Sequence, residues 1–241
     1  MSNRFVANHH LFEDLSPIEL AALFAHVQVT TIPKGQPIFH EGSRPTGLFF
    51  VIHGKAKVSK RGLWNHEQIV RLAGPGDLLT LRAVGGTPQL VVSATALEDT
   101  DVLSIDMDDF FNVIKTNVTF AFKMIELLAR ELDHAENRIR DLAQMSVRQR
   151  LADLLLNLHR IYHDGSEDGS IGVKLSREDL ANCVGTATET VVRLLSEFRE
   201  KRILAVDGRS IFILDRERLE RASRPDRLFP IARIDKNQSL S

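Results

Sequence analysis

The chain has 241 residues, a length that suits two modest domains, each able to bury a core without disulfides or structural metals. Its single cysteine excludes an internal disulfide and an iron–sulfur cluster, which needs about four thiolates. The net charge of -1 gives no bulk attraction to nucleic acid, although residues 144–241 lean slightly basic. Since no apolar stretch suits a membrane span or a signal peptide, we expect a cytoplasmic protein without a membrane partner.

The first part of the chain predicts a short helix followed by an all-β domain. Residues 11–25 are amphipathic, and Pro17 follows Ser16 in the manner of a first helical turn. From about residue 27 to residue 105, seven or so short β-rich runs are separated by glycines and other turn residues. This spacing is typical of a sandwich or roll, so we assign residues 1–107 to a β-roll sensor domain.

A heptad pattern follows, from which we expect residues 108–144 to form a dimerisation helix. A core helix packed on the roll would also be apolar, and Phe122, Met124 and Leu127 widen the stripe beyond a strict seam. We expect both arrangements together, with one edge of the helix on the roll and the seam on a second subunit. The seam consists of Val118, Ala121, Ile125, Leu128, Leu132, Ala135, Ile139 and Leu142.

A capping box then marks the start of a new helix. Ser146 with Gln149 follows the end of the heptad phase and precedes an apolar helical pattern. The hinge between the domains is therefore expected at residues 143–146.

Two further capping boxes predict a helix-turn-helix. Ser176 with Asp179 opens one helix, and Gly185 ends it. Thr186 with Glu189 opens another helix, whose apolar residues recur at helical spacing. The tight glycine turn between the two helices is typical of the helix-turn-helix motif.

A hairpin follows the second of these helices. Residues 203–206 and 210–214 have strand character and are joined through Asp207-Gly208, a dipeptide that favours a type I′ turn. This hairpin would form a wing. We therefore assign residues 145–222 to a winged helix-turn-helix domain.

This order of elements resembles the Crp/Fnr family of bacterial transcription regulators over about residues 11–222. The matching motifs of the roll are Lys34-Gly35, Ile38-Phe39, Glu41-Gly42, Gly47-Leu48-Phe49-Phe50-Val51, Gly54 and Gly74-Pro75-Gly76-Asp77. Those of the C-terminal half are Arg150-Leu151-Ala152, Leu154-Leu155, Asp179-Leu180-Ala181, Val184-Gly185, Thr188-Glu189-Thr190-Val191 and Arg193. Residues 223–241 have little periodicity and are expected to be irregular.

The resemblance implies an α+β fold with a cupin-like double-stranded roll and a DNA-binding transcription regulator without catalytic activity. A homodimer would present two recognition helices to successive major grooves, about one helical turn apart, at an inverted repeat with a TGA-like half-site core. Double-stranded DNA, a second copy of the chain and RNA polymerase are the expected partners. The sequence also lacks a Walker loop, a dinucleotide fingerprint and the hydrolase motifs GxSxG and HExxH.

The candidate base-reading residues lie near the start of the second helix. Arg193 can donate two hydrogen bonds to guanine, Glu189 can accept one from cytosine, and Val192 can touch a thymine methyl; Thr188 lies beside them. Glu189 also occupies the N3 position of the capping box with Thr186, so cap and base compete for its carboxylate. The remaining DNA-binding candidates, which provide caps, phosphate contacts or a solvated helix end, are Ser176, Arg199, Lys201, Arg202 and Arg209.

We do not expect cAMP to be the effector of the roll, because the residues that bind it in the family are absent. The cyclic-nucleotide branch of the family has a Gly-Glu pair after Pro-Gly-Asp and a later Arg-Ser pair for the cyclic phosphate. Here Asp77 is followed by Leu78-Leu79-Thr80-Leu81, and Pro88-Gln89 offers no cation. A buried phosphate without a charged partner costs several kcal/mol. The candidate residues for a pocket of unknown effector are Gly76, Leu79, Thr80, Leu81, Arg82 and Gln89.

No metal site is expected, and haem is left open. His40 and His53 are the candidate axial ligands, although either is otherwise an ordinary polar side chain. His159 and His163 lack a third ligand, and Cys183 is expected to be a small buried residue rather than a redox switch. The alternative function is a small-molecule sensor or regulatory module, haem-based or not, whose helix-turn-helix contacts protein instead of DNA.

Overall fold

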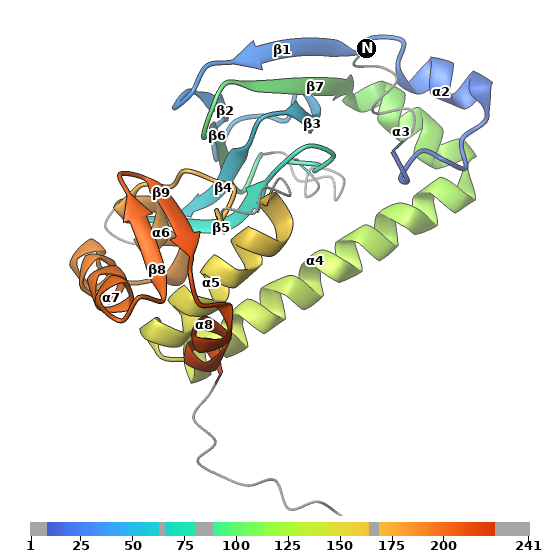
Figure 1. Ribbon diagram of the computed structural model, residues 1–241. Coiled ribbons are helices and arrows are strands. Elements are labelled where there is room, and N and C mark those ends of the chain that lie inside the picture. Colours follow the sequence, from blue (N-terminus) through green and yellow to red (C-terminus); the bar gives the residue numbers. More distant parts are fainter. Residues whose placement is uncertain (1–8, 63–65, 81–88, 164–168, 225–241) are drawn as a thin grey trace, which may run out of the picture.

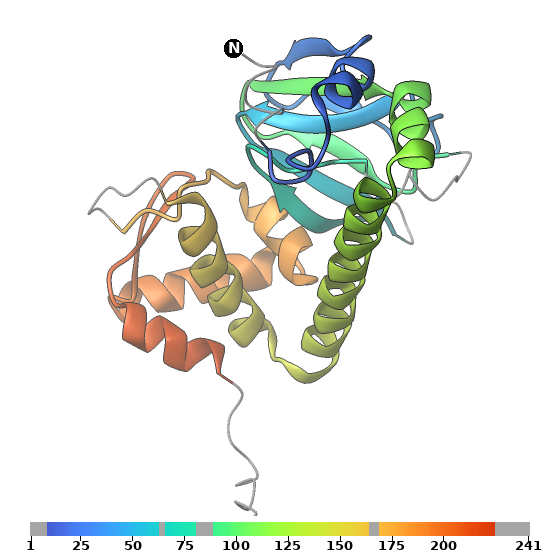
Figure 2. The same cartoon turned by 90° about the vertical axis from the view of Figure 1, so that its right-hand side faces the viewer.

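The structure is a computed structural model that describes residues 9–62, 66–80, 89–163 and 169–224. A β-roll lies at one end of the molecule, and the long helix α4 (Val118–Gln144) leads from it to the other end (Figure 1). There the chain reverses, so that α5 (Val147–Tyr162) runs back toward the roll (Figure 2). The fold is α+β, as predicted. Within the described ranges, no helix is long and apolar enough to cross a bilayer.

The N-terminal helix α2 (Pro17–Leu23) is shorter than the predicted helix over residues 11–25. The Ser16 hydroxyl accepts from the backbone N–H of Glu19, which fixes the start of the helix at Pro17. Residues 11–15 instead form turns that bury Leu11, Phe12 and Leu15 in the core. The apolar spacing in this segment therefore reflects burial and not helical continuation.

The roll consists of two antiparallel sheets, with strand orders β1-β7-β3 and β2-β6-β4-β5. Their facing sides bury a shared core that includes Phe39, Val51, Ala56, Val58 and Ala94. The predicted run of about seven strands is confirmed in the described part of the chain. The strands are β1 (Gln28–Ile32), β2 (Pro37–Phe39), β3 (Gly47–His53), β4 (Ala56–Arg61), β5 (Glu67–Ala73), β6 (Ser93–Ala96) and β7 (Thr100–Asp106).

The prediction of one helix over residues 108–144 is wrong, because α3 (Met107–Thr116) ends before α4 begins. Asn117 between them has φ −116° and ψ 101°, and its side chain accepts from Phe120 N to cap α4. Phe110 of α3 and Phe120 of α4 are buried edge to face, with ring centroids 5.8 Å apart. This corner keeps α3 on the roll and directs α4 away from it.

The C-terminal elements enclose a separate core cluster. The predicted capping box of Ser146 and Gln149 is confirmed, and the extended backbone at Met145 separates α4 from α5 within the expected hinge. The last helix was not predicted from the sequence, since Leu219 is its one buried side chain. The elements after α5 are α6 (Arg177–Val184), α7 (Thr188–Glu200), β8 (Leu204–Asp207), β9 (Ser210–Ile213) and α8 (Arg216–Ser223).

The hairpin is confirmed, but its predicted turn type is wrong. Asp207 pairs with Ser210, so the two-residue loop is Gly208-Arg209. A type I′ turn needs positive φ at both loop residues, whereas Gly208 has φ 55° and Arg209 does not have a positive φ.

Candidate functional site

The turn between α6 and α7 is built as the sequence predicts. The Ser176 hydroxyl accepts from Asp179 N at 2.9 Å, and the Asp179 carboxylate accepts from Ser176 N at 3.1 Å. Gly185 ends α6 with φ 69°, a left-handed conformation that favours glycine. Ser176 is thus fully used as a helix cap, and the turn brings the start of α7 next to the end of α6.

The second predicted capping box does not form. The N-cap of α7 is Ala187, which has no side-chain cap, and the Thr186 N–H donates to Ala181 O at 3.1 Å. The helix starts one residue later than the Thr186–Glu189 pattern requires. The predicted competition between cap and base for Glu189 is therefore wrong, and its carboxylate lies exposed in the first turn of α7.

One face of α7 is left free for contact with a partner. Glu189, Val192 and Arg193 are exposed, and Thr188 beside them is half-buried. Val192 keeps 45% of its surface exposed. The opposite face is buried in the domain core through Val191, Leu194, Leu195 and Phe198. The four candidate base-reading residues therefore lie together at the N-terminal end of the helix.

The wing tip lies beside the N-terminus of α6. Arg209 is exposed in the two-residue loop of the hairpin. Arg177 Nη2 donates to Gly208 O at 3.0 Å, and burial lowers the pKa of Arg177. Arg177 could not be singled out from the sequence, because a basic residue in the first turn of a helix carries no recognisable pattern. This hydrogen bond fixes the wing tip against the first turn of α6.

The C-terminal end of α7 borders a basic groove that the sequence analysis also missed. Arg199 is exposed, whereas the Lys201 ammonium is bound to Glu197 at 2.8 Å. Arg148 shares the same carboxylate and lies over the Phe198 ring, 4.7 Å from its centroid. The groove, of about 480 Å³, is lined by the cationic residues Arg148, Lys201, Arg218, Arg221 and Arg224.

The two sets of positions in the heptad seam of α4 differ in exposure. The exposed apolar side chains recur every seven residues and keep 67%, 59%, 60% and 67% of their surface exposed; they are Val118, Ile125, Leu132 and Ile139. Ala121, Leu128 and Ala135 are half-buried, and Leu142 is 41% exposed. The opposite side of α4 reaches the roll through the buried Phe120 and Met124.

Phe122 lies on the open side of α4 and not against the roll. It is 66% exposed, so its aromatic ring adds to the free apolar surface beside Val118 and Ile125. Met124 and Leu127, which also widen the apolar stripe, do pack against the roll core. An exposed apolar strip of this length is typical of an interaction site.

The structure describes four of the six predicted effector-pocket residues, Gly76, Leu79, Thr80 and Gln89. Leu79 is 3% exposed in the core of the roll. Thr80 is also buried, and its hydroxyl accepts from Phe49 N at 2.9 Å and donates to Gly47 O at 3.3 Å. Gly76 has φ 95° in a turn, Gln89 is exposed, and Leu81 and Arg82 lie outside the described residues. Leu79 and Thr80 thus belong to the packed interior of the roll.

The candidate haem ligands lie on the roll, and the two candidate metal ligands lie at the end of α5. His40 and His53 are exposed on the roll. The rings of His159 and His163 are 4.4 Å apart, and His159 Nδ1 lies 2.8 Å from Ser170 O. In the described part of the chain, no group of three His, Cys, Asp or Glu residues could hold a metal ion.

Cys183 is a buried residue of α6, as predicted. It is 6% exposed, and burial raises the pKa of its thiol to about 12. The thiol therefore stays protonated at neutral pH, and a protonated thiol is a poor nucleophile.

Two protein-family models match the chain: a cyclic nucleotide-binding domain over residues 29–117 and a Crp-like helix-turn-helix domain over residues 149–222. The chain is 28% identical over 225 residues to the CRP-like cAMP-activated global transcriptional regulator of Mycobacterium tuberculosis, covering 92% of this chain and 100% of the relative. It is also 28% identical over 212 residues to the cyclic AMP receptor protein of Thermus thermophilus, covering 87% and 94%.

Two solved structures have a similar fold. FixK2 of Bradyrhizobium japonicum is 26% identical and superposes with a TM-score of 0.73, covering 83% of this chain and 98% of that one. A transcription regulator of the crp/fnr family from Eubacterium rectale has the same TM-score at 24% identity, covering 89% and 97%.

Proposed function

Because the chain belongs to the Crp/Fnr family of transcription regulators, we propose that it binds a specific DNA sequence as a homodimer through α7. The observation that carries the proposal is the exposed N-terminal face of α7, with Glu189, Val192 and Arg193 on one side and the domain core on the other. A helix with this division inserts its free N-terminal face into the major groove.

Arg193 and Glu189 are the proposed base-reading pair. The Arg193 guanidinium donates to O6 and N7 of guanine, and the Glu189 carboxylate accepts from N4 of cytosine, each contact discriminating by about 1–3 kcal/mol. The pair supports a TGA-like half-site core. The methyl groups of Val192 fit a thymine methyl, whereas Thr188 offers a hydroxyl to the flanking bases. Arg209, at the wing tip, and Arg199 are proposed phosphate contacts.

The α4 seam is the proposed dimer interface. Val118, Ile125, Leu132 and Ile139 repeat every seven residues and are exposed in the single chain. Two such helices packed side by side would bury these side chains in knobs-into-holes contacts. A two-fold dimer requires an inverted repeat in the DNA. RNA polymerase is the proposed partner at the promoter.

We do not carry cAMP over from the relatives to this chain. Pro88-Gln89 lacks a cation for the cyclic phosphate, and Leu79 and Thr80 are part of the roll core. Calorimetric titration of the purified protein with cAMP should therefore give no binding heat. Saturable binding at micromolar cAMP would overturn this part of the proposal.

The central test is binding to an inverted repeat of TGA-type half-sites. Glu189→Gln keeps the side-chain size and removes the charge, so affinity should fall about tenfold, with the loss confined to one base pair of each half-site. Helix content should not change, since Glu189 caps nothing. Asp133→Asn, at an exposed position of α4, is the charge-matched control and should bind like wild type. The logarithm of affinity should fall linearly with the logarithm of salt concentration; an absent salt slope contradicts DNA binding and favours protein contact.

A further inference from the structure

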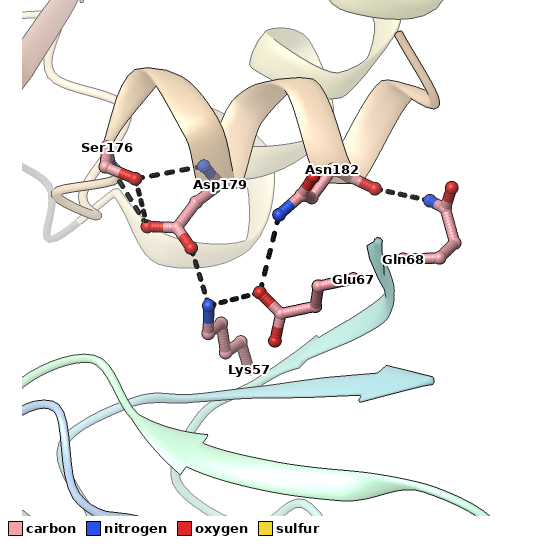
Figure 3. Close-up of polar contacts among 6 residues, drawn as sticks. All are labelled: Lys57, Glu67, Gln68, Ser176, Asp179 and Asn182. Atoms are coloured by element: carbon pink, nitrogen blue, oxygen red, sulfur yellow. Dashed lines mark hydrogen bonds and ion pairs between the residues drawn. The ribbon is translucent and has the colours of Figure 1, made fainter. Parts of the chain in front are cut away.

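Polar side chains of the roll hold α6 and leave the basic groove uncovered (Figure 3). Lys57 Nζ, on β4, donates to Asp179 Oδ1 at 2.8 Å and to Glu67 Oε2 at 2.7 Å. The Gln68 side-chain amide donates to Asn182 O. None of these five residues lines the basic groove at the C-terminal end of α7. The groove is therefore a separate surface of the C-terminal domain.

The basic groove carries more positive charge than the neighbouring carboxylates neutralise. Arg148 and Lys201 share one carboxylate, that of Glu197. The Arg218 guanidinium donates to Lys201 O at 2.9 Å and lies 3.9 Å from the Asp215 carboxylate. Among the described residues, the lining holds five basic side chains and no Asp or Glu. An anionic partner therefore suits this groove.

Two arginines of α8 supply the unpaired charge. In the described part of the chain, neither Arg221 nor Arg224 has a carboxylate partner, and both are exposed. Arg221 Nε donates to the backbone oxygen of Glu217 at 3.4 Å, and Gln149 Nε2 donates to Arg224 O at 2.9 Å. The second contact fixes the end of α8 to the first turn of α5. The terminal nitrogens of both guanidinium groups remain available, and their planar fork matches the geometry of a phosphate.

The basic groove lies on the flank of the proposed reading face of α7. Lys201 comes eight residues after Arg193, which places it about 80° around the helix and about 12 Å further along it. Phosphates border the major groove on both sides, and the groove is about 12 Å wide. A duplex that is read by α7 thus presents its backbone to this flank.

The start of α5 places the basic groove near the two-fold axis of the proposed dimer. Ser146 follows Leu142 of the seam by four residues, so their Cα atoms are at most about 14 Å apart. Arg150 donates to Leu142 O at 3.3 Å and to Met145 O at 2.7 Å, which holds α5 against the end of α4. Half-sites one helical turn apart have centres about 34 Å from each other, so each centre is about 17 Å from the axis. In such a dimer the basic groove lies over the DNA between the half-sites.

We propose that the basic groove binds phosphates of the spacer DNA between the two half-sites. The proposal rests on the proposed DNA-binding function and adds a site that reads no base. Phosphate contacts carry no sequence information, but they fix the register of a protein on the duplex and raise its affinity for every sequence alike. An acidic peptide would also match the charge, but the position beside the reading face and the dimer axis favours the DNA backbone.

The test measures DNA binding of the full chain with Arg221→Gln, Arg224→Gln and both together. Arg216→Gln is the charge-matched control, because Arg216 is exposed on the same helix, pairs with Glu220 at 2.9 Å and does not line the groove. An arginine lost from both subunits removes about two phosphate contacts, so the slope of log affinity against log salt should fall by about 1.8. Near 0.1 M salt, affinity should fall by up to about 60-fold per substitution, for the inverted repeat and for scrambled half-sites alike.

Duplexes with uncharged methylphosphonate linkages locate the contact. Placed in the spacer, these linkages should weaken binding of wild type and weaken binding of the double variant much less. Placed outside both half-sites, they should affect the two proteins alike. Circular dichroism checks that each variant is folded.

The outcomes separate this proposal from the proposed function. If wild type binds the repeat and the double variant keeps its affinity and salt slope, the groove proposal is overturned while the proposed function stands. A loss no larger than that of Arg216→Gln reflects bulk charge and overturns it as well. If wild type itself does not bind the repeat, the proposed function fails, and the groove proposal fails with it.

Discussion

The exposed seam of α4 predicts how strongly a single side chain holds the proposed dimer. Leu132 lies in the middle of the seam and keeps 60% of its surface exposed. Fully burying a leucine side chain contributes about 1.5–3 kcal/mol, so covering the exposed part gives about 1–2 kcal/mol per copy. Both copies lose this burial in Leu132→Ala. The dimer should therefore weaken by about 2–4 kcal/mol, which raises its dissociation constant roughly 30- to 800-fold.

Sedimentation over a range of protein concentrations measures this constant directly. Alanine preserves helix propensity, and Leu132 contributes little to the monomer core, so the folded monomer should keep its helix content. Asn137→Ala, an exposed change on the opposite side of the heptad, is the control and should dimerise like wild type. An unchanged dissociation constant for Leu132→Ala, or an equal loss in Asn137→Ala, would refute the assignment of the seam.

Three further predictions concern the stability of the fold. A Cβ at Gly54 (φ +81°) would lie 2.6 Å from Asp99 O, whereas Gly42 (φ +85°) has open space around it. In chemical unfolding, Gly42→Ala should lower the free energy of unfolding by about 1–2 kcal/mol and Gly54→Ala should lower it clearly more. Equal losses would contradict the clash at Gly54. Arg202 has φ 51° after the C-terminus of α7, so Arg202→Gly should raise the free energy of unfolding by about 1 kcal/mol, and no gain would mean that the left-handed conformation carries no strain. The pKa of Asp179 is lowered from 3.8 and that of Lys57 raised from 10.5, so their pair is ionised between these values. The stability lost in Lys57→Met should thus be constant from about pH 5 to 9 and vanish as acid protonates Asp179; a change near neutral pH would assign the effect to other groups.

The sequence predicted well wherever the cause is local. Ser146 and Ser176 start helices because each hydroxyl reaches a backbone N–H three residues later, and both caps are present. Gly185 ends α6 because its φ of 69° favours glycine. Thr186 has the same pattern as the two serines, but α7 begins one residue later, and nothing in the local pattern distinguishes the two registers.

The sequence pattern did not predict the features that depend on tertiary packing. The apolar pattern of residues 11–15 reflects burial in turns, and the pattern over residues 108–144 contains a corner at Asn117. Leu79 and Thr80 resemble pocket residues by position, yet the roll uses both in its interior. In each case a side chain meets distant segments, and periodicity carries no information about them.

The sequence alone determined the kinds of element and pointed to the proposed reading face, because periodicity, capping and turn chemistry act over a few residues. The two-domain order, the seven-residue seam and the grouping of Glu189, Val192 and Arg193 all follow from such short-range patterns. Only the tertiary structure decided where the DNA-binding domain rests. Lys57 and Asp179 are 122 residues apart in the chain, and their contact exists because α5 runs back toward the roll and brings α6 onto β4 and β5. That docking largely buries the two charges against each other.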